Sequence, residues 1–486
     1  MATDTSISAE SAPDDASAPA LETMQTTFQR QRAAYAAAPY PTASARRDAL
    51  ARLKAALLRH QDALVAAVDQ DFGGRARQET LTADIIPTLN SIRHTRRHLK
   101  RWMRPQRRWP HPLMQPAGAR IEYQPLGIVG VMVPWNYPVF LSLGPLVCAL
   151  GAGNRAMLKL SEFTPAANQV LQTLLAEAFD ADEVAVILGD LPVSQAFSQL
   201  SFDHLLFTGS TAVGRKVMAA AAHNLTPVTL ELGGKSPAII DHDAPMAPSV
   251  ERLLFGKLVN AGQTCIAPDY VLCVTDRVDE LLSAIRHTTA RLFPSLRDNP
   301  DYTSIINEAQ HHRLLALLED ARQRGARVLE INPAEEHFHN SRKLPLHLVL
   351  DAPPDARVLQ EELFGPILPI IPVPDLDAAL DHVAKGPRPL ALYYFGHDRA
   401  RQQHVLRYSH SGGVCLNDTL LHVAQDALPF GGIGESGMGH YHGHHGFLTF
   451  SKEKAVFTRG RINSTRLIFP PYGGRLQQWI QRLMLR

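Results

Sequence analysis

Cysteine is scarce in this sequence. Its 486 residues include four, at Cys148, Cys265, Cys273 and Cys415. So few cysteines in so long a chain exclude a disulfide framework of the kind that holds small secreted domains together. Because no secretory signal peptide is recognisable, the sequence predicts a cytoplasmic protein with reduced thiols.

An excess of charge of one sign is also missing. The chain has 49 Lys and Arg against 47 Asp and Glu, so its net charge of +2 gives no reason to expect a nucleic-acid partner. A basic run from Arg93 to Arg108 is interpreted as a solvated helix face, with a lipid or nucleic-acid surface as the alternative. The apolar run at 139–150 is too short to cross a bilayer, so no transmembrane span is expected.

Several motifs of known chemistry are absent as well. The sequence contains no internal repeat, no GxSxG nucleophile elbow and no HExxH metal motif, so nothing supports a serine hydrolase or a metalloprotease. One histidine-rich tract runs from His440 to His445, but no cysteine or carboxylate completes a site locally. We therefore expect no metal.

The length and composition predict an α/β protein of two or three domains. Hydrophobic residues make up 45% and charged residues 20%, and 486 residues exceed what one core normally supports. Residues 1–20 are expected to form a disordered tail, and helical periodicity follows at 45–72 and at about 79–103. Strands and helices then alternate, which predicts a doubly wound parallel sheet. The expected strands are 128–133, 156–160, 184–188, 204–207 and 228–230.

One cysteine lies in a short polar loop between a helical pattern at 250–259 and a β-branched run at 271–274. An isolated cysteine is usually a small buried thiol that packs like a hydrophobe. This loop, however, also offers amide side chains and backbone N–H groups near the thiol. It reads Asn260-Ala261-Gly262-Gln263-Thr264-Cys265-Ile266-Ala267-Pro268-Asp269-Tyr270.

A carboxylate that could serve this thiol ends an apolar run 34 positions earlier. Glu231 stands in the stretch Leu230-Glu231-Leu232-Gly233-Gly234-Lys235-Ser236-Pro237. Its two glycines let another backbone or a substrate come close. A free thiol titrates near about 8.5 and only the thiolate attacks, so a nearby base makes a cysteine a better nucleophile.

Together these two stretches resemble the aldehyde dehydrogenase superfamily. Glu231 falls in the family's base motif, Cys265 falls in its nucleophile motif, and 34 positions is the usual separation. The sequence of residues 262–270 is similar to that of the class 3 branch, and within this branch to the bacterial coniferyl aldehyde dehydrogenases. The resemblance extends from about Leu21 to Phe457.

The resemblance implies a fold with a Rossmann-type cofactor domain, an α/β catalytic domain and a small β oligomerisation arm. It places the NAD-binding domain at 21–230, with 111–124 contributing to the arm, and the catalytic domain at 231–425. Residues 426–460 would return to the arm, and 461–486 would form an amphipathic tail. The arm would combine the strand Arg120–Tyr123 with segments near the C-terminus and would join two chains as a homodimer.

The resemblance also implies a binding site for the adenosine part of a nicotinamide cofactor. Lys159 and Glu162 would hold the ribose hydroxyls with Ser161 between them, although Leu160 stands where the family usually has Pro. Because a glutamate repels a 2′-phosphate, NAD is expected, with NADP as the alternative. Without this context, a Lys–Glu pair is most often a surface ion pair.

Further residues would contact the diphosphate and the nicotinamide end. Gly209 and Ser210 follow a strand and precede a helix at about 211–222, where small residues let a phosphate approach the helix N-terminus. A Gly-x-x-x-x-Gly spacing alone is a weak signal. By the same resemblance Glu362 would bind the nicotinamide ribose, and Phe364 and Trp135 would lie near the cofactor.

The expected reaction oxidises an aldehyde to a carboxylic acid. Cys265 would attack the aldehyde carbon, Asn136 and the Cys265 N–H would hold the oxyanion, and Glu231 would activate the water that hydrolyses the thioester. An aromatic, coniferyl-type aldehyde is expected ahead of a medium-chain aliphatic one. A CoA-acylating dehydrogenase and a non-catalytic protein on the same scaffold stay open as alternatives.

The C-terminal tail is expected to form a short amphipathic helix. Its apolar residues recur at i, i+3, i+4, i+7 and i+8 and are Leu476, Trp479, Ile480, Leu483 and Met484. We expect this face to pack on the protein, ahead of covering the substrate entrance or touching a lipid surface.

Overall fold

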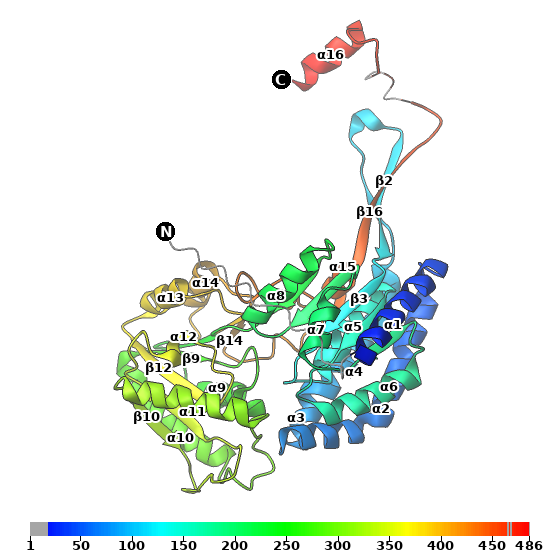
Figure 1. Ribbon diagram of the computed structural model, residues 1–486. Helices are drawn as coiled ribbons and strands as arrows, with labels where there is room; N and C mark the ends of the chain where they lie inside the picture. Colours follow the sequence, from blue (N-terminus) through cyan, green and yellow to red (C-terminus); the bar gives the residue numbers. More distant parts are fainter. Residues whose placement is uncertain (1–17, 464–465, 467–468, 486) are drawn as a thin grey trace, which may run out of the picture.

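The computed structural model of the protein describes residues 18–463, 466 and 469–485. Two α/β halves form the body, and a narrow β arm projects from one of them (Figure 1). The expected α/β class with parallel sheets is confirmed, since two of the three sheets are mainly parallel.

Five helical segments come before the first strand in the described part of the chain. Helix α2 confirms the expected helix at 45–72 and ends at Gly73, whose φ of 65° is the left-handed conformation that glycine adopts easily. The second expected helix is interrupted, because a π-helical turn, η1, precedes Pro87. The segments are α1 (Ala18–Ala37), α2 (Ala43–Phe72), α3 (Arg77–Thr80), η1 (Leu81–Ile85) and α4 (Ile86–Trp102). Because α1 begins at Ala18, residues 18–20 are helical rather than part of a disordered tail, and residues 1–17 lie outside the described residues.

The first large sheet has six strands in the order β15-β7-β6-β3-β4-β5. The five strands expected from the sequence are all present and parallel, and the short β15 pairs antiparallel with β7. The strands are β3 (Ile128–Met132), β4 (Arg155–Lys159), β5 (Val184–Ile187), β6 (His204–Thr208), β7 (Val228–Glu231) and β15 (Gly437–Met438).

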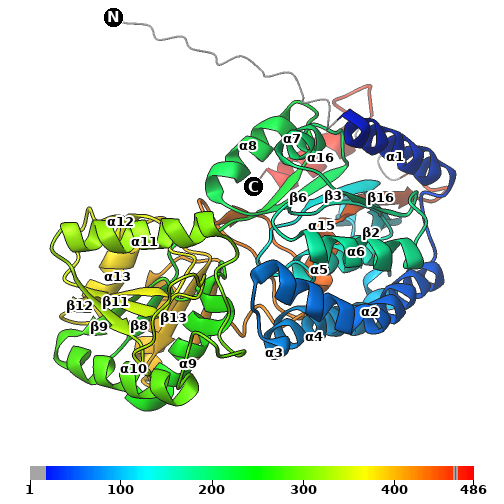
Figure 2. The ribbon, with the colours of Figure 1, turned by 60° about the horizontal axis from the view of Figure 1, so that its bottom comes forward.

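Helices cover both faces of this sheet, as Figure 2 shows. Val129 and Val131 of β3 join the core formed with α2, α4, α5 and α6, whereas Ile128 and Met132 join the core with α1, α7 and α8. This alternation follows from the two-residue period of a strand. The additional helices are α5 (Phe140–Ala152), α6 (Pro165–Ala178), α7 (Leu191–Ser198) and α8 (Thr211–Ala222).

The second large sheet has seven strands in the order β10-β11-β12-β9-β8-β13-β14, and only β10 is antiparallel to its neighbour. Its strands are β8 (Pro237–Ile240), β9 (Tyr270–Val274), β10 (Arg327–Ile331), β11 (Leu346–Leu350), β12 (Ile367–Val373), β13 (Ala391–Phe395) and β14 (Gly413–Leu416). Its helices are α9 (Met246–Leu258), α10 (Val278–Leu292), α11 (Glu308–Gln323), α12 (Arg357–Gln360), α13 (Leu376–Lys385) and α14 (Arg399–Tyr408).

The arm is a three-stranded antiparallel sheet in the order β1-β2-β16. It comprises β1 (Gln106–Arg108), β2 (Ala117–Pro125) and β16 (Ser451–Arg459), with Arg120 paired to Val456. The predicted combination of the Arg120–Tyr123 strand with a segment near the C-terminus is therefore confirmed. Helix α15 (Gly443–Thr449) precedes β16 and packs on α4 and α5.

The sheets change near the expected domain limits. β7 ends at Glu231 and β8, which belongs to the other sheet, begins at Pro237, while β15 returns to the first sheet at Gly437. We keep the limits 21–230, 231–425, 426–460 and 461–486 as a proposal for the domains.

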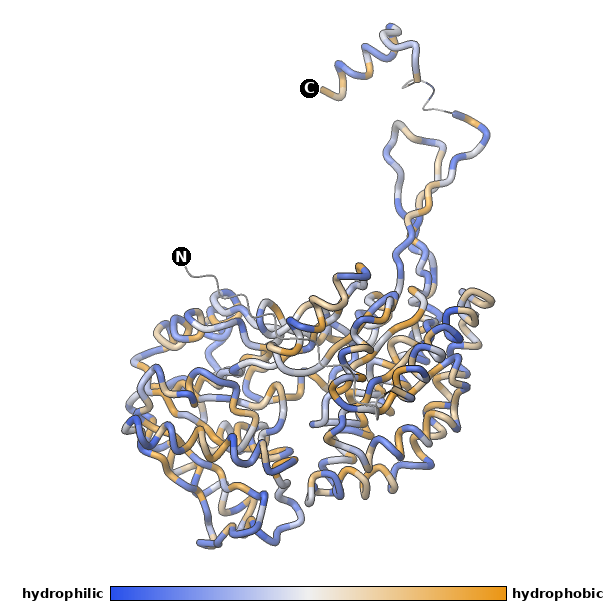
Figure 3. The backbone as a smooth tube through the Cα atoms, viewed as in Figure 1, coloured by the Kyte–Doolittle hydropathy of each residue, from blue (hydrophilic) through white to orange (hydrophobic). Residues whose placement is uncertain are grey.

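The expected C-terminal helix is present as α16 (Arg475–Met484), but it does not pack on the body. It lies beyond the tip of the arm (Figure 1), and Figure 3 shows apolar and polar residues mixed along it. Trp479 exposes 61% and Leu483 62% of its surface, and no residue of the helix is buried. The expectation that its apolar face packs on the same chain is wrong, because the arm carries the helix away from the body.

Candidate functional site

Several of the predicted site residues lie at one edge of the six-stranded sheet. β3, β4, β6 and β7 run parallel, so the residues that follow their carboxyl ends meet at the same edge. β3 lies between β4 and β6, and the helices that follow β3 and β6 cover opposite faces. Ligands of open parallel sheets bind at such a reversal point. The residues at this edge are Trp135, Asn136, Lys159, Ser161, Glu162, Gly209, Ser210 and Glu231.

The cysteine loop begins with a strained backbone. After α9, the turn η3 (Val259–Gly262) contains Asn260 and Ala261 at φ values of 54° and 52°, in the left-handed region that non-glycine residues rarely adopt. Gly262 follows at φ 75°, and a Cβ there would lie 2.6 Å from the Gly365 carbonyl oxygen. Such strain persists only where the surroundings fix it, and it is frequent at functional sites.

Hydrogen bonds from the amide side chains hold this backbone in place. The Nε2 of Gln263 donates to the carbonyls of Asn260 and Ser304, both at 3.0 Å, and its Oε1 accepts from the Ile306 N–H at 2.9 Å. The Asn260 Nδ2 donates to the carbonyls of Asn136 and Gln263 at 3.0 and 3.1 Å. The amides therefore fix the segment that carries Cys265.

The residues on either side of Cys265 are anchored by tyrosines. The Tyr137 hydroxyl lies 2.6 Å from the Thr264 Oγ1, and the Tyr393 hydroxyl donates to the Ile266 carbonyl. These tyrosines come from different halves of the body. The position of the thiol is thus defined by both halves together.

Cys265 is a protonated thiol in this environment. Burial is the largest cause that raises its pKa, to about 12, and the carboxylates of Glu362 and Glu231 raise the pKa further. The backbone N–H groups of Cys265 and Ile266 oppose this effect by hydrogen bonding to the sulfur. A reaction that starts from this thiol must therefore remove its proton.

Glu231 is buried with no polar partner. Both of its carboxylate oxygens lack a hydrogen bond within the described part of the chain, and the residue is 3% exposed. Burial raises the pKa of Glu231 well above its ordinary value. A carboxyl left unpaired in the interior is costly and is typical of a functional group rather than a structural one.

Asn136 lies directly beside the cysteine loop. Its Nδ2 donates to the Gln263 carbonyl at 3.1 Å, and the residue is almost fully buried. The structure thus brings this amide close to Cys265 from the other half of the body. Its role as an oxyanion donor stays a prediction.

Trp135 and Phe364 meet between the two halves. Their ring centroids are 5.4 Å apart, with the planes at 76°, and Phe364 has a φ of 50°. Nearby, a Cβ on Gly233 would lie 2.1 Å from the Glu362 carboxylate. Burial raises the pKa of Glu362 to about 8, and Asp269 adds to this effect.

The remaining predicted cofactor residues surround the ends of β4 and β6. The Lys159 Nζ donates to the Leu160 carbonyl at 2.8 Å, while Glu162 is exposed. Burial lowers the pKa of Lys159, and Glu162 opposes this effect. Ser210 is the N-cap of α8 and its hydroxyl accepts from the Val213 N–H at 3.4 Å.

Two ion pairs at the site, one partly and one fully buried, were not predicted as functional. Lys235 forms an ion pair with Asp269 and donates to the carbonyls of Val358 and Glu361 at 2.9 and 2.8 Å. Asp269 also accepts from the Leu363 N–H at 2.8 Å, so the pair links the glutamate, cysteine and Glu362 segments. Lys235 lies in the stretch that contains Glu231, and Asp269 lies in the loop that contains Cys265. This position within the two motifs is the sequence signal that could have identified them.

The other pair is formed by Arg75 and Asp84, which are 3.1 Å apart with both side chains fully buried. Arg75 donates to the Asn136 carbonyl at 3.2 Å, and Asp84 accepts from the N–H groups of Val139 and Phe140. The pair therefore fixes the loop that carries Asn136. No local pattern in the sequence distinguishes these two residues from the other charged residues nearby.

No helix in the described part of the chain combines the length and the apolar character needed to cross a bilayer.

The sequence matches the model of the aldehyde dehydrogenase family over residues 15–456. It is 55% identical over 466 residues to a probable coniferyl aldehyde dehydrogenase of Pseudomonas aeruginosa, covering 96% of this chain and 97% of that protein. It is 48% identical over 428 residues to the coniferyl aldehyde dehydrogenase of a Pseudomonas species, covering 87% and 88%.

Solved structures show the same similarity. The substrate-bound state of Staphylococcus aureus AldH superposes with a TM-score of 0.89 at 36% identity, covering 95% of this chain and 99% of that one. A Mycobacterium tuberculosis aldehyde dehydrogenase complexed with NAD+ superposes with a TM-score of 0.81 at 26% identity, covering 90% of each chain.

Proposed function

This chain belongs to the aldehyde dehydrogenase family, and we propose that it oxidises a coniferyl-type aromatic aldehyde to the acid with NAD. It is an enzyme that oxidises an aldehyde with a nicotinamide cofactor. The observation that best supports the proposed chemistry is a thiol beside a buried carboxyl group that has no polar partner among the residues the structure describes. The two relatives described as coniferyl aldehyde dehydrogenases support the aromatic substrate.

In the proposed reaction the Cys265 thiol first loses its proton to solvent water, and the thiolate sulfur then attacks the aldehyde carbon. The Asn136 Nδ2 leaves the Gln263 carbonyl and, with the Cys265 N–H, donates to the oxyanion that forms. A preorganised donor of this kind is worth about 3 kcal/mol in the transition state. A nicotinamide cofactor bound here would supply the acceptor for the hydride that leaves the former aldehyde carbon.

Hydrolysis then releases the acid. Glu231 takes a proton from water, the resulting hydroxide attacks the thioester carbonyl, and the Cys265 thiolate leaves. General-base help of this kind is typically worth about 10²–10⁴-fold. Because burial raises the pKa of Glu231, the fraction of the active carboxylate rises with pH.

Residues at the sheet edge fit a dinucleotide. Glu162 is exposed at the end of β4, and Ser210 caps the N-terminus of α8. The glycines in the turns carry no side chain that would keep a ligand away from the backbone. We propose that Lys159, Ser161 and Glu162 hold the adenosine ribose and that Gly209 and Ser210 hold the diphosphate. Trp135, Glu362 and Phe364 would enclose the nicotinamide end.

Replacing Glu162 by Gln tests the proposed preference for NAD. The negative charge of Glu162 opposes the 2′-phosphate of NADP, so we expect Glu162→Gln to raise the ratio of kcat/KM for NADP to that for NAD by about tenfold, the equivalent of about 1.4 kcal/mol. Steady-state kinetics with both cofactors measure the ratio, and Glu435→Gln provides an exposed carboxylate control. An unchanged ratio would show that another group sets the preference.

A panel of aldehydes tests the proposed substrate. We expect kcat/KM to fall from coniferyl aldehyde to octanal to acetaldehyde. The relatives support the aromatic aldehyde as the first of these, and acetaldehyde comes last because it lacks the apolar surface that a hydrophobic pocket can bury. Product analysis with and without CoA identifies the acid and separates hydrolysis from CoA acylation. A preference for acetaldehyde would contradict an apolar pocket. The same panel run on a chain ending at Phe469 shows whether the tail contributes to the ranking.

We also propose that the protein is a cytoplasmic homodimer. Its four cysteines are all free thiols, which suits a reducing compartment. In the arm, β16 forms a nine-residue edge strand with Phe457 half exposed, and such an edge offers unpaired N–H and C=O groups with which another chain can pair. Sedimentation should give about twice the mass of the 53.5 kDa chain. A monomer at micromolar concentration would contradict the proposed dimer.

A further inference from the structure

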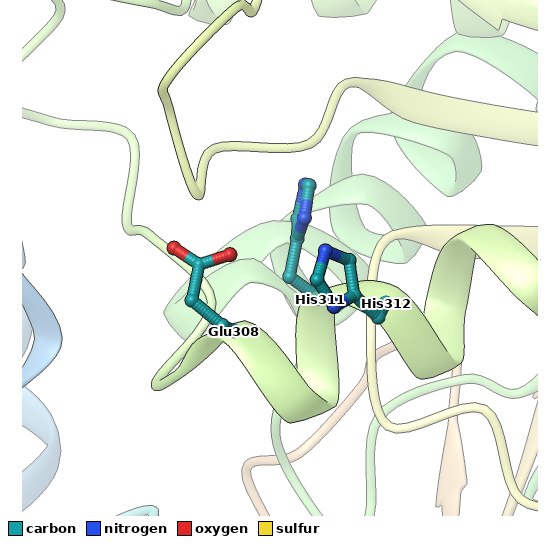
Figure 4. Close-up of side chains that lie close together, drawn as sticks. All are labelled: Glu308, His311 and His312. Atoms are coloured by element: carbon teal, nitrogen blue, oxygen red, sulfur yellow. The ribbon is translucent and has the colours of Figure 1, made fainter.

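The first turn of α11 carries three potential metal ligands. Glu308, His311 and His312 follow the i, i+3, i+4 spacing that places side chains on one side of a helix. Figure 4 shows the three side chains next to one another above this turn. Their ligand atoms all lie within 4.8 Å of one another.

None of these ligand atoms is engaged elsewhere. Within the described residues, neither imidazole nor the Glu308 carboxylate forms a hydrogen bond or an ion pair, and the three groups interact mainly with each other. His311 is half-buried, whereas Glu308 and His312 are exposed. An imidazole nitrogen that is not already hydrogen-bonded can offer its lone pair to a metal.

The comparable group at Asp241, His242 and Asp243 differs in this respect. Asp241 already binds Arg401 and the Tyr394 hydroxyl, and Asp243 accepts from the N–H groups of His397 and Asp398. Three of its four carboxylate oxygens are occupied by the fold, and Asp243 Oδ1 is the one without a hydrogen bond among the described residues. Of these two groups, the α11 group has more of its ligand atoms available.

We propose that Glu308, His311 and His312 bind a divalent transition metal, with zinc as the best match. Two imidazoles and one carboxylate form a ligand set that Zn²⁺ accepts, with the remaining position open to water. Glu308 and His312 are exposed, so a metal ion reaches the site directly from solvent.

The site lies close in sequence to contacts of the catalytic centre. The segment just before α11 holds Gln263 through the Ser304 carbonyl and the Ile306 N–H. One residue after His312, Arg313 donates to the carbonyls of Glu362 and Leu363. A metal that fixes the first turn of α11 therefore stiffens the connection between the cysteine loop and the Glu362 segment.

Cobalt and zinc titrations of the full chain test the site. We expect one equivalent of Co²⁺ to bind with visible d–d bands and without thiolate charge transfer, and Zn²⁺ to displace it. The double variant His311→Ala/His312→Ala should lose this equivalent. Glu308→Gln should weaken binding by more than about tenfold, because losing an outer-shell partner of a metal ligand already costs about 10–100-fold.

The matched control is His337→Ala/His339→Ala, which removes two exposed histidines whose ring centroids are 6.4 Å apart. It should keep the bound equivalent. The proposal would be overturned if the α11 double variant bound the metal as the wild type does, or if the control variant lost the bound equivalent. It would also be overturned if the wild type bound no metal at micromolar concentration. Circular dichroism confirms that the variants are folded. Because the readout is metal binding, the result does not depend on the proposed aldehyde chemistry.

Discussion

Replacing Cys265 by Ala should lower aldehyde oxidation by about 10⁴-fold or more, because removing a nucleophile leaves only binding and electrostatic effects. Of the four thiols, Cys265 alone lies in the loop held by Gln263, with Glu231 and Glu362 close enough to influence its pKa. The cofactor residues are not altered by the change. NADH formation measures activity, and calorimetric titration with NAD should still show binding.

The matched control is Cys273→Ala. Cys273 is a fully buried thiol in β9, paired with the neighbouring strands β8 and β12, so its loss should reduce stability but leave turnover near the wild-type value. A Cys265→Ala enzyme that kept a tenth of wild-type turnover would show that the proposed nucleophile is wrong.

The second large effect is expected for Glu231→Gln, which should slow thioester hydrolysis more than hydride transfer. The amide cannot take a proton from water, so the rate of thioester hydrolysis should fall by about 10²–10⁴-fold, the range typical of losing a general base. Rapid mixing should show a burst of NADH followed by a very slow steady state. Glu183→Gln, which changes a carboxylate paired with Arg52 away from the site, serves as the control.

The pH dependence of the steady-state rate provides a separate test of the role of Glu231. Burial raises the pKa of Glu231, so the wild-type steady-state rate should increase with pH as the carboxylate becomes ionised. In Glu231→Gln this dependence of hydrolysis should disappear. Loss of the burst itself would instead assign Glu231 to removing the proton of the Cys265 thiol, whose pKa burial also raises.

The sequence predicted much of the local structure because that structure depends on nearby residues. The helix at 43–72 follows from its apolar period and its glycine stop, and the parallel strands follow from short apolar runs between helices. Motif residues that end such strands must gather at one edge of a parallel sheet. The position of Asn136 beside the loop of Cys265 could therefore be anticipated.

Other features depend on contacts between distant segments. The helix expected at 79–103 contains a π-helical turn whose Asp84 binds Arg75 and the N–H groups that begin α5. The apolar face of α16 lies away from the body because the arm extends between them, and helical periodicity does not specify where a face will pack.

The sequence by itself determined the family, the secondary-structure elements and the identity of the candidate nucleophile and base. Tertiary structure alone decided that Glu231 is buried with no partner in the described part of the chain and that burial raises the pKa of the Cys265 thiol. It also decided that Arg75 supports the Asn136 loop. The physical reason is that residue type and spacing fix local conformation, whereas desolvation and hydrogen-bond partners depend on which distant segments pack together.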